Sequence, residues 1–216
     1  MKSPGIPTIR NKFMEMMSNP GYFTNIDDEY VRALPVLNFN GTINVVDQAS
    51  GFDLVRDILK NETVLGFDTE TRPSFKKGQV HQVALLQLSS ANNALLIRTN
   101  KVRFPRFILD ILEDEKITKV GVAIKDDING LNKISSFIPA GFIDLQQFVK
   151  QYGIEDNGLK KLVANIMGFR ISKKSQTSNW EQEVLTREQL EYAATDAWVC
   201  RQMYEILSGS KQAIAS

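Results

Sequence analysis

The pattern of hydrophobic and polar residues predicts strands and helices that alternate over most of the chain. Short apolar runs typical of strands cover residues 42–46, 64–69, 83–89, 94–97, 120–124 and 142–145. The pattern also predicts helices up to residue 59 and over residues 107–112, 128–134, 146–152 and 159–167. The strands at 64–69, 83–89 and 94–97 follow one another without a helix between them, and helices separate the later strands. This order predicts a mixed α/β sheet that begins antiparallel and ends parallel.

The first 38 residues are predicted to form a helical extension in front of a domain that covers residues 39–210. Two short helices, around residues 9–17 and 27–34, are separated by the helix-breaking segment 19–21. The extension could mediate self-association or pack against the domain. An apolar helical stripe usually belongs to a core, which favours packing. Ser50 or Asp53 is expected to cap the next helix.

The run at residues 64–67 ends in two acids, Asp68 and Glu70, one residue apart. Alternate residues of a strand share a face, so the two side chains point the same way. Neighbouring carboxylates repel each other and lose hydration, a cost that a bound cation can offset. Hard ions such as Mg²⁺ or Mn²⁺ prefer carboxylate oxygens. The alternative is that these acids end a strand because the following turn is solvated.

The start of the last helix is well marked in the sequence. Thr186 and Gln189 have the spacing of a capping box, and Leu185 and Leu190 have that of a hydrophobic staple. The helix is therefore expected to begin directly after Thr186.

Two further groups of polar residues carry candidate chemistry. Tyr192 and Asp196 are four residues apart and share one face of the predicted last helix. The strand at 120–124 runs into Asp126 and Asp127, which could open a helix. The fold could bring these groups to the acids at the end of the strand at 64–69.

The motifs at residues 67–70, 121–127 and 192–197 resemble, in this order, those of the DEDD superfamily of 3′-5′ exonuclease domains. The resemblance is to the tyrosine subgroup, which includes RNase D and the exonuclease domain of the Werner syndrome helicase, and it extends from about residue 40 to about residue 207. It implies an RNase H-like fold and removal of nucleotides from the 3′ ends of DNA or RNA. It also implies two divalent ions, Mg²⁺ or Mn²⁺, as cofactors.

The resemblance implies a role for each motif residue. Asp68 would bridge the two metal ions, and Glu70 and Asp196 would complete the site of the ion that activates water. Asp127 would hold the other ion through water, and Tyr192 would orient the attacking water.

Two nearby residues have simpler interpretations. Asp126 adjoins Asp127 and is a candidate cap for the helix that follows, because counting from Gly121 in the family pattern selects Asp127 as the ligand. His81 lies far upstream of Asp196, so the histidine-type arrangement of related exonucleases is not available. His81 is expected at the surface or beside the site.

Candidate substrate-binding residues are Thr69, Arg170, Lys173, Lys174 and Trp180. A basic loop beside acidic metal ligands could hold substrate phosphates, although a solvated, mobile loop would have the same composition. Trp180 could stack on a base or pack in the interior.

Composition narrows the class of protein. The formal net charge of the 216 residues is +1, so any groove for nucleic acid must be local. The single cysteine, Cys200, excludes an internal disulfide and is expected to be a buried thiol in a reducing, cytoplasmic protein. No apolar run has the length of a membrane span. An active exonuclease, a binding module of the same fold that acts with a partner, and a structural domain remain as alternatives. Loss of ligand residues would favour the binding module, but every acidic motif position and the tyrosine are present here.

Overall fold

The described part of the chain folds around a six-stranded sheet. The computed structural model describes residues 21–74, 76 and 78–214, so the helix predicted over 9–17 lies outside the described residues. Within these ranges the strand order is β1-β4-β3-β2-β5-β6. The strands are β1 (Thr42–Val46), β2 (Val64–Thr71), β3 (Val83–Ser89), β4 (Asn93–Ile97), β5 (Thr118–Gly121) and β6 (Phe142–Asp144).

The pairing of the strands confirms a mixed sheet. Strands β2, β3 and β4 are antiparallel neighbours, and β5 and β6 continue the sheet in parallel from β2. Strand β1 adds one more parallel pair at the edge, next to β4. The order follows from the connections, because the short β2–β3–β4 links allow antiparallel pairing and the helical links before β5 and β6 allow parallel pairing.

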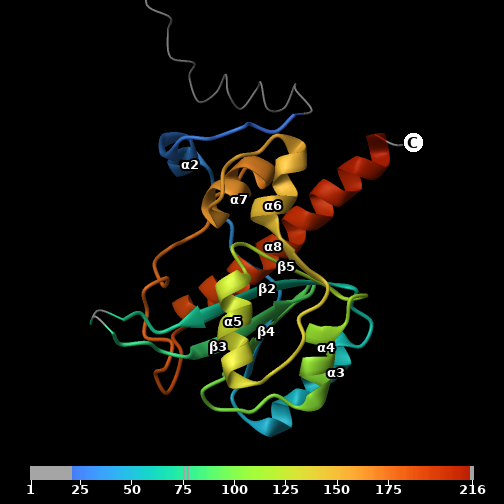
Figure 1. Cartoon of the computed structure of the whole chain (residues 1–216). Helices are drawn as coiled ribbons and strands as arrows, with labels where there is room; N and C mark the ends of the chain where they lie inside the picture. Colours follow the sequence, from blue (N-terminus) through green and yellow to red (C-terminus); the bar gives the residue numbers. More distant parts are fainter. Residues whose placement is uncertain (1–20, 75, 77, 215–216) are drawn as a thin grey trace, which may run out of the picture.

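Helices cover both faces of the sheet (Figure 1). One face packs against α3 (Phe52–Leu59), α4 (Arg106–Glu113) and α5 (Lys125–Ile134). The other face packs against α8 (Arg187–Ile214), which continues past the sheet to α6 (Leu145–Phe148), the 3₁₀ turn η2 (Val149–Tyr152) and α7 (Leu159–Met167). Strand β3 is therefore buried on both faces along its whole length.

The side chains of β2 alternate between these two layers. Leu65 and Phe67 belong to the core under α3, α4 and α5. Gly66 faces the opposite way, where a Cβ atom would lie 1.8 Å from the carbonyl oxygen of Ala197 in α8. Helix α8 therefore lies directly against β2 because residue 66 has no side chain. By the same alternation Asp68 and Glu70 face α8.

Replacing Gly66 by alanine is expected to lower the free energy of unfolding by about 2 kcal/mol, because the added methyl group overlaps backbone that cannot move away without shifting α8. Urea unfolding of the variant measures this. Gly209→Ala is the control, because it adds a methyl group to α8 itself at a position with nothing within 4 Å. Equal midpoints for both variants would contradict the close contact as the reason for glycine at 66.

Residues 22–39 pack onto the domain. Asp27 caps the short helix α2 (Asp28–Ala33) by accepting a hydrogen bond of 2.6 Å from the backbone of Tyr30. Four apolar residues of this segment form a cluster with Ala164 of α7: Ile26, Tyr30, Val31 and Leu34. The segment then runs beside Arg170, whose backbone bonds to Pro35 and Leu37. Within the described residues the extension thus follows the packing alternative.

Several predicted element ends differ from the structure. The predicted strand 120–124 stops at Gly121, because Ala123 adopts a φ of 59° and its N–H donates to Asp144 Oδ1 at 3.1 Å. Helix α5 then begins at Lys125, earlier than predicted.

The predicted helix caps were correct only in part. The capping box is confirmed, since Thr186 Oγ1 accepts from the Gln189 N–H at 3.3 Å and Gln189 Oε1 accepts from the Thr186 N–H at 2.9 Å. Neither Ser50 nor Asp53 caps α3, because a 3₁₀ turn, η1 (Ala49–Gly51), precedes that helix and Gly51 is its N-cap. Asp126 does not cap α5 either: the N-cap is Ile124, and no side chain bonds there.

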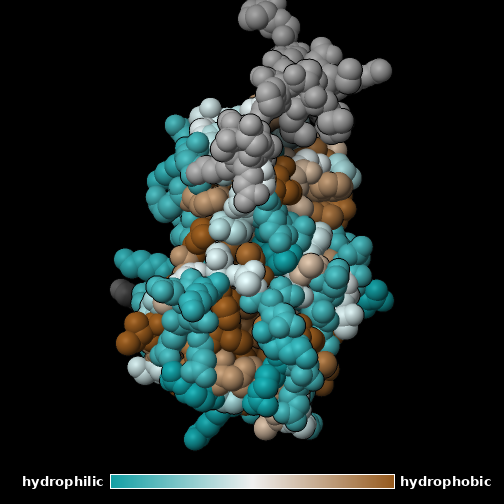
Figure 2. Space-filling view, turned by 90° about the vertical axis from the view of Figure 1, so that its right-hand side faces the viewer, coloured by the Kyte–Doolittle hydropathy of each residue, from teal (hydrophilic) through white to brown (hydrophobic). Residues whose placement is uncertain are grey.

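Among the described residues, the large hydrophobic side chains exposed at the surface are Val36, Val45, Leu54, Val80, Ile138, Val184 and Ile206. On the face in Figure 2, hydrophilic residues surround smaller apolar areas. No helix among the described residues combines the length and the hydropathy that a bilayer span requires.

Candidate active site

Three carboxylates meet where the end of β2 faces α8. Asp68 and Glu70 come from β2 and Asp196 from α8, and one carboxylate oxygen of each lies within 4.8 Å of the others. They line a cleft of about 310 Å³, which we call the acidic cleft. Asp196 is 5% exposed, and Asp196 Oδ1 is buried without a hydrogen-bond partner among the described residues. Such an arrangement is costly unless a cation occupies it.

Burial raises the pKa of all three groups, and repulsion by neighbouring acids adds to the shift for Asp68 and Glu70. Burial, followed by the charges of Asp196 and Asp127, raises the pKa of Asp68 well above its ordinary value. Burial, followed by the other acids, raises the pKa of Glu70 to about 10. Burial raises the pKa of Asp196 to about 7, although Tyr192 and Lys173 act in the opposite direction. The cluster therefore resists carrying three negative charges at once, a cost that a bound cation would offset.

Tyr192 stands one turn before Asp196 on the same face of α8, as the sequence predicts. Its phenol interacts with the Asp196 carboxylate and lines the acidic cleft. Burial and the neighbouring carboxylates raise the pKa of the phenol. Tyr192 therefore keeps its proton and can donate a hydrogen bond into the cleft.

Asp127 does not join the three carboxylates. It lies in the first turn of α5, on the other side of the sheet from α8, and accepts a hydrogen bond from the hydroxyl of Thr69. Thr69 points to that side because it lies between Asp68 and Glu70 on β2. The negative charge of Asp127 still acts across the strand, since it raises the pKa of Asp68 and of Glu70.

The predicted basic loop divides between two pockets. Lys173 is exposed and lines the acidic cleft, where its charge lowers the pKa of Asp196. Arg170 and Lys174 line a neighbouring pocket of about 470 Å³, which shares Tyr192 and Asp196 with the cleft. Arg170 also donates from Nε to the carbonyl oxygen of Leu34 at 2.9 Å and thereby holds the N-terminal segment.

Trp180 follows the packing alternative. It is 0% exposed and packs with Leu85, Leu96 and Ala193. Its ring lies 6.0 Å from the ring of Tyr192, between centroids. The prediction that Trp180 stacks on a base is therefore wrong, because the ring is enclosed by protein. The ring instead supports the position of Tyr192.

Two other sequence-predicted residues and one unpredicted residue lie near the site. Cys200 is buried, as expected, and lines the acidic cleft. His81 lies outside the cleft and contacts Glu181. Lys160 also lines the cleft, from the first turn of α7. Sequence reasoning missed Lys160, because no pattern distinguishes it from the adjacent Lys161, which pairs with Asp156 instead.

The family of the chain follows from comparison with known proteins. A family model described as 3′-5′ exonuclease matches residues 43–210, a range that contains the three carboxylates, Tyr192 and Asp127. The chain belongs to the 3′-5′ exonuclease family. The resemblance to exonucleases of the DEDD superfamily is thereby confirmed, as is the RNase H-like fold.

Individual members of the 3′-5′ exonuclease family match most of the chain. Exonuclease 3′-5′ domain-containing protein 2 of Mus musculus is 33% identical over 180 residues, which is 76% of this chain and 27% of that protein. The bifunctional 3′-5′ exonuclease/ATP-dependent helicase WRN of Mus musculus is 33% identical over 184 residues, which is 81% of this chain and 13% of that protein. The chain spans less than half the length of the first curated relatives that it matches.

A solved structure shows the same fold. RNase D of Trypanosoma brucei, crystallised in complex with RNA U12, matches with a TM-score of 0.71 and 20% identity over 79% of this chain and 64% of that one.

The donor set of the acidic cleft fits a divalent cation of the kind that 3′-5′ exonucleases use. Three carboxylates from two elements offer hard oxygen ligands, and the buried Asp196 Oδ1 has no other partner among the described residues. The chemistry of the residues therefore agrees with the binding of a hard divalent ion.

Without metal, the thermal stability is expected to fall as pH rises between about 4.5 and about 10. The folded protein keeps a proton on Glu70 over this range, whereas the unfolded chain has lost it, so rising pH favours unfolding. Melting temperatures at pH 5.5 and 8.5, measured in EDTA, should differ more for the wild type than for Glu70→Gln. Added Mn²⁺ should reduce the difference, because it replaces the protons. The same pH dependence for both proteins would contradict the shifted carboxyl.

Proposed function

We propose that this protein is a metal-dependent 3′-5′ exonuclease of the tyrosine subgroup, which hydrolyses phosphodiester bonds from the 3′ end of DNA or RNA. The observation that carries the proposal is the meeting of three carboxylates, of which Asp196 is buried, with the phenol of Tyr192 in one cleft. Membership of the 3′-5′ exonuclease family supports the same reaction.

Asp68, Glu70 and Asp196 would hold the metal ions, with Asp68 between the two positions. Two bound divalent ions supply a hydroxide near neutral pH and neutralise charge on the attacking and leaving oxygens. Asp127 would serve the second position through water, which agrees with its place behind Thr69 rather than in the cluster. Thr69 would then orient Asp127 through the hydrogen bond from its hydroxyl.

Tyr192 would donate its hydroxyl hydrogen to the attacking water and so orient the lone pair of that water toward phosphorus. The raised pKa of the phenol, which keeps its hydrogen at neutral pH, and its place in the cleft support this role. Lys173 and Lys160 line the same cleft and would contact the scissile phosphate or its neighbours. Arg170 and Lys174 would act in the adjoining pocket.

A time course on end-labelled single-stranded DNA, single-stranded RNA and 3′-recessed duplex tests the proposal. With Mg²⁺ or Mn²⁺ we expect a ladder that shortens from the 3′ end and disappears with EDTA. The order of rates on the three substrates would identify the preferred nucleic acid. Metal binding without cleavage of any substrate would contradict the enzyme and favour a binding module of the same fold.

A further inference from the structure

A basic pocket lies beside the acidic cleft and belongs to no motif of the proposed reaction. Its volume is about 360 Å³, and its polar lining consists of Arg72, Lys76, Gln79, His81, Thr177 and Asn179. The loop between β2 and β3 supplies the first four residues, and the loop before α8 supplies the other two. We call it the basic pocket.

The basic pocket and the acidic cleft adjoin along two chain segments. Glu70 lines the cleft and Arg72 lines the basic pocket, so the two sites are joined by the last residues of β2. Gln176 lines the cleft and Thr177 lines the basic pocket. In an extended chain two residues span about 7 Å, so the basic pocket starts within a short step of the carboxylates.

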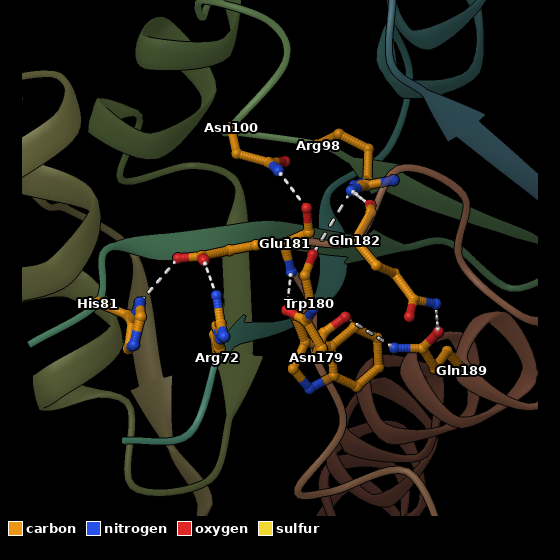
Figure 3. A network of polar contacts seen from close by, with 9 residues as sticks. All are labelled: Arg72, His81, Arg98, Asn100, Asn179, Trp180, Glu181, Gln182 and Gln189. Atoms are coloured by element: carbon orange, nitrogen blue, oxygen red, sulfur yellow. Dashed lines mark hydrogen bonds and ion pairs between the residues drawn. The ribbon is translucent and has the colours of Figure 1, made fainter. Parts of the chain in front are cut away.

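The charges of the basic pocket suit an anion. Arg72 and Lys76 are cationic, and the Arg72 side chain is 46% exposed. The acid at its edge, Glu181, pairs with Arg72 at 3.2 Å and lies 3.0 Å from His81 Nδ1 (Figure 3). His81 Nε2 is buried without a partner among the described residues. The Arg72 guanidinium offers donors in a fork that matches phosphate oxygens, and the Asn179 amide lines the same pocket as a further possible N–H donor.

The backbone around Glu181 is held independently of its carboxylate. The Glu181 N–H donates to Asn179 Oδ1 at 3.2 Å, and Asn100 donates to the Glu181 carbonyl oxygen. The buried Arg98 donates to the carbonyl oxygen of Gln182 at 2.6 Å (Figure 3). The Glu181 carboxylate is thus not required to position its loop, and its contacts are directed at Arg72 and His81.

We propose that the basic pocket binds a backbone phosphate of the nucleic-acid strand, upstream of the nucleotides in the acidic cleft. The inference rests on the proposed exonuclease function. Glu181 holds the Arg72 guanidinium in place in the free protein, and the incoming phosphate replaces Glu181 as the partner of Arg72. The site therefore acts on strands long enough to reach it and not on a dinucleotide.

This proposal predicts opposite effects for the two partners of one ion pair. Arg72→Gln removes a phosphate contact and should weaken binding of a single-stranded dodecamer about fivefold at low salt, with the slope of log affinity against log salt reduced by about 0.7. Glu181→Gln removes a competing anion and should tighten binding about twofold. If the ion pair only supports the fold, both variants should bind the dodecamer more weakly than the wild type.

The experiment measures fluorescence anisotropy of a labelled deoxythymidine dodecamer in Ca²⁺ over a series of salt concentrations, beside Mg²⁺-dependent hydrolysis of a dinucleotide. Arg56→Gln is the matched control, because Arg56 is an exposed arginine paired with Asp53 on α3, away from the cleft. We expect dinucleotide hydrolysis to stay at the wild-type rate in all three variants. A wild-type salt slope for Arg72→Gln, or weaker binding by Glu181→Gln, would overturn the proposal.

The failure of this site and the failure of the proposed function have different signatures. If the wild type hydrolyses no substrate, the exonuclease proposal fails, and the contrast between Arg72→Gln and Glu181→Gln in dodecamer binding still decides the pocket. If hydrolysis is normal and both variants bind the dodecamer as the wild type does, only the phosphate site fails.

Discussion

Replacing Asp68 by asparagine is expected to lower the rate of 3′-end hydrolysis by about a thousandfold. Asp68 is one of three acids whose carboxylate oxygens lie within 4.8 Å of one another, and it is the proposed ligand of both metal positions, so its loss affects both. Single-turnover hydrolysis of an end-labelled strand with Mg²⁺ measures the effect. Asparagine has nearly the same shape, which leaves β2 and α8 in contact.

The same substitution should raise the thermal stability of the metal-free protein at pH 8. The neutral amide removes a buried carboxyl whose pKa is raised by burial and by its neighbours, so the folded state no longer resists its ionisation. Asp126→Asn is the control, because Asp126 is an exposed acid in the first turn of α5 and is not part of the cluster. A stable, folded Asp68→Asn protein with wild-type turnover would exclude Asp68 as a ligand.

Replacing Tyr192 by phenylalanine is expected to lower turnover about a hundredfold while Mn²⁺ affinity stays near that of the wild type. Only the hydroxyl is lost, and the ring keeps its contact with Trp180, 6.0 Å away between centroids. The substitution leaves the three clustered carboxylates unchanged, so the candidate metal ligands remain. Turnover at saturating substrate and Mn²⁺ titration by calorimetry separate the two quantities.

Tyr204→Phe serves as the control for Tyr192→Phe, because Tyr204 lies on the same helix and its ring packs against Phe148. It should keep wild-type turnover. If Tyr192→Phe also turns over normally, the hydroxyl does not orient the attacking water. If instead both turnover and Mn²⁺ affinity fall together, the phenol supports the ligands and not the water.

The sequence alone determined the local geometry of the proposed site. The two-residue period of a strand places Asp68 and Glu70 on one face, and the helical period places Tyr192 and Asp196 on one face. The capping box of Thr186 and Gln189 starts α8 in the register that these faces need. These features depend on neighbours within a few residues, which a linear pattern records. The order of strands and helices likewise predicted the mixed sheet.

Only the tertiary structure decided which of these faces meet. Asp68 and Glu70 face α8 because Gly66 lets Ala197 approach the strand, a contact across more than a hundred residues that no local period encodes. The hydrogen bond between Thr69 and Asp127 also joins residues far apart in sequence, and it holds Asp127 on the face of the strand opposite the other three acids.

The roles of the loop residues likewise depend on contacts between residues that are distant in sequence. Trp180 has an aromatic surface suited to a base or to a core, and its burial against Leu85 and Ala193 settles the choice. Arg72 and Glu181 form a pair across 109 residues and so create the basic pocket. Sequence patterns thus determined the elements and their faces. Hydrophobic burial and charge pairing depend on distance in space, so the packing of the sheet against α8 and the loops determined which residues share a site.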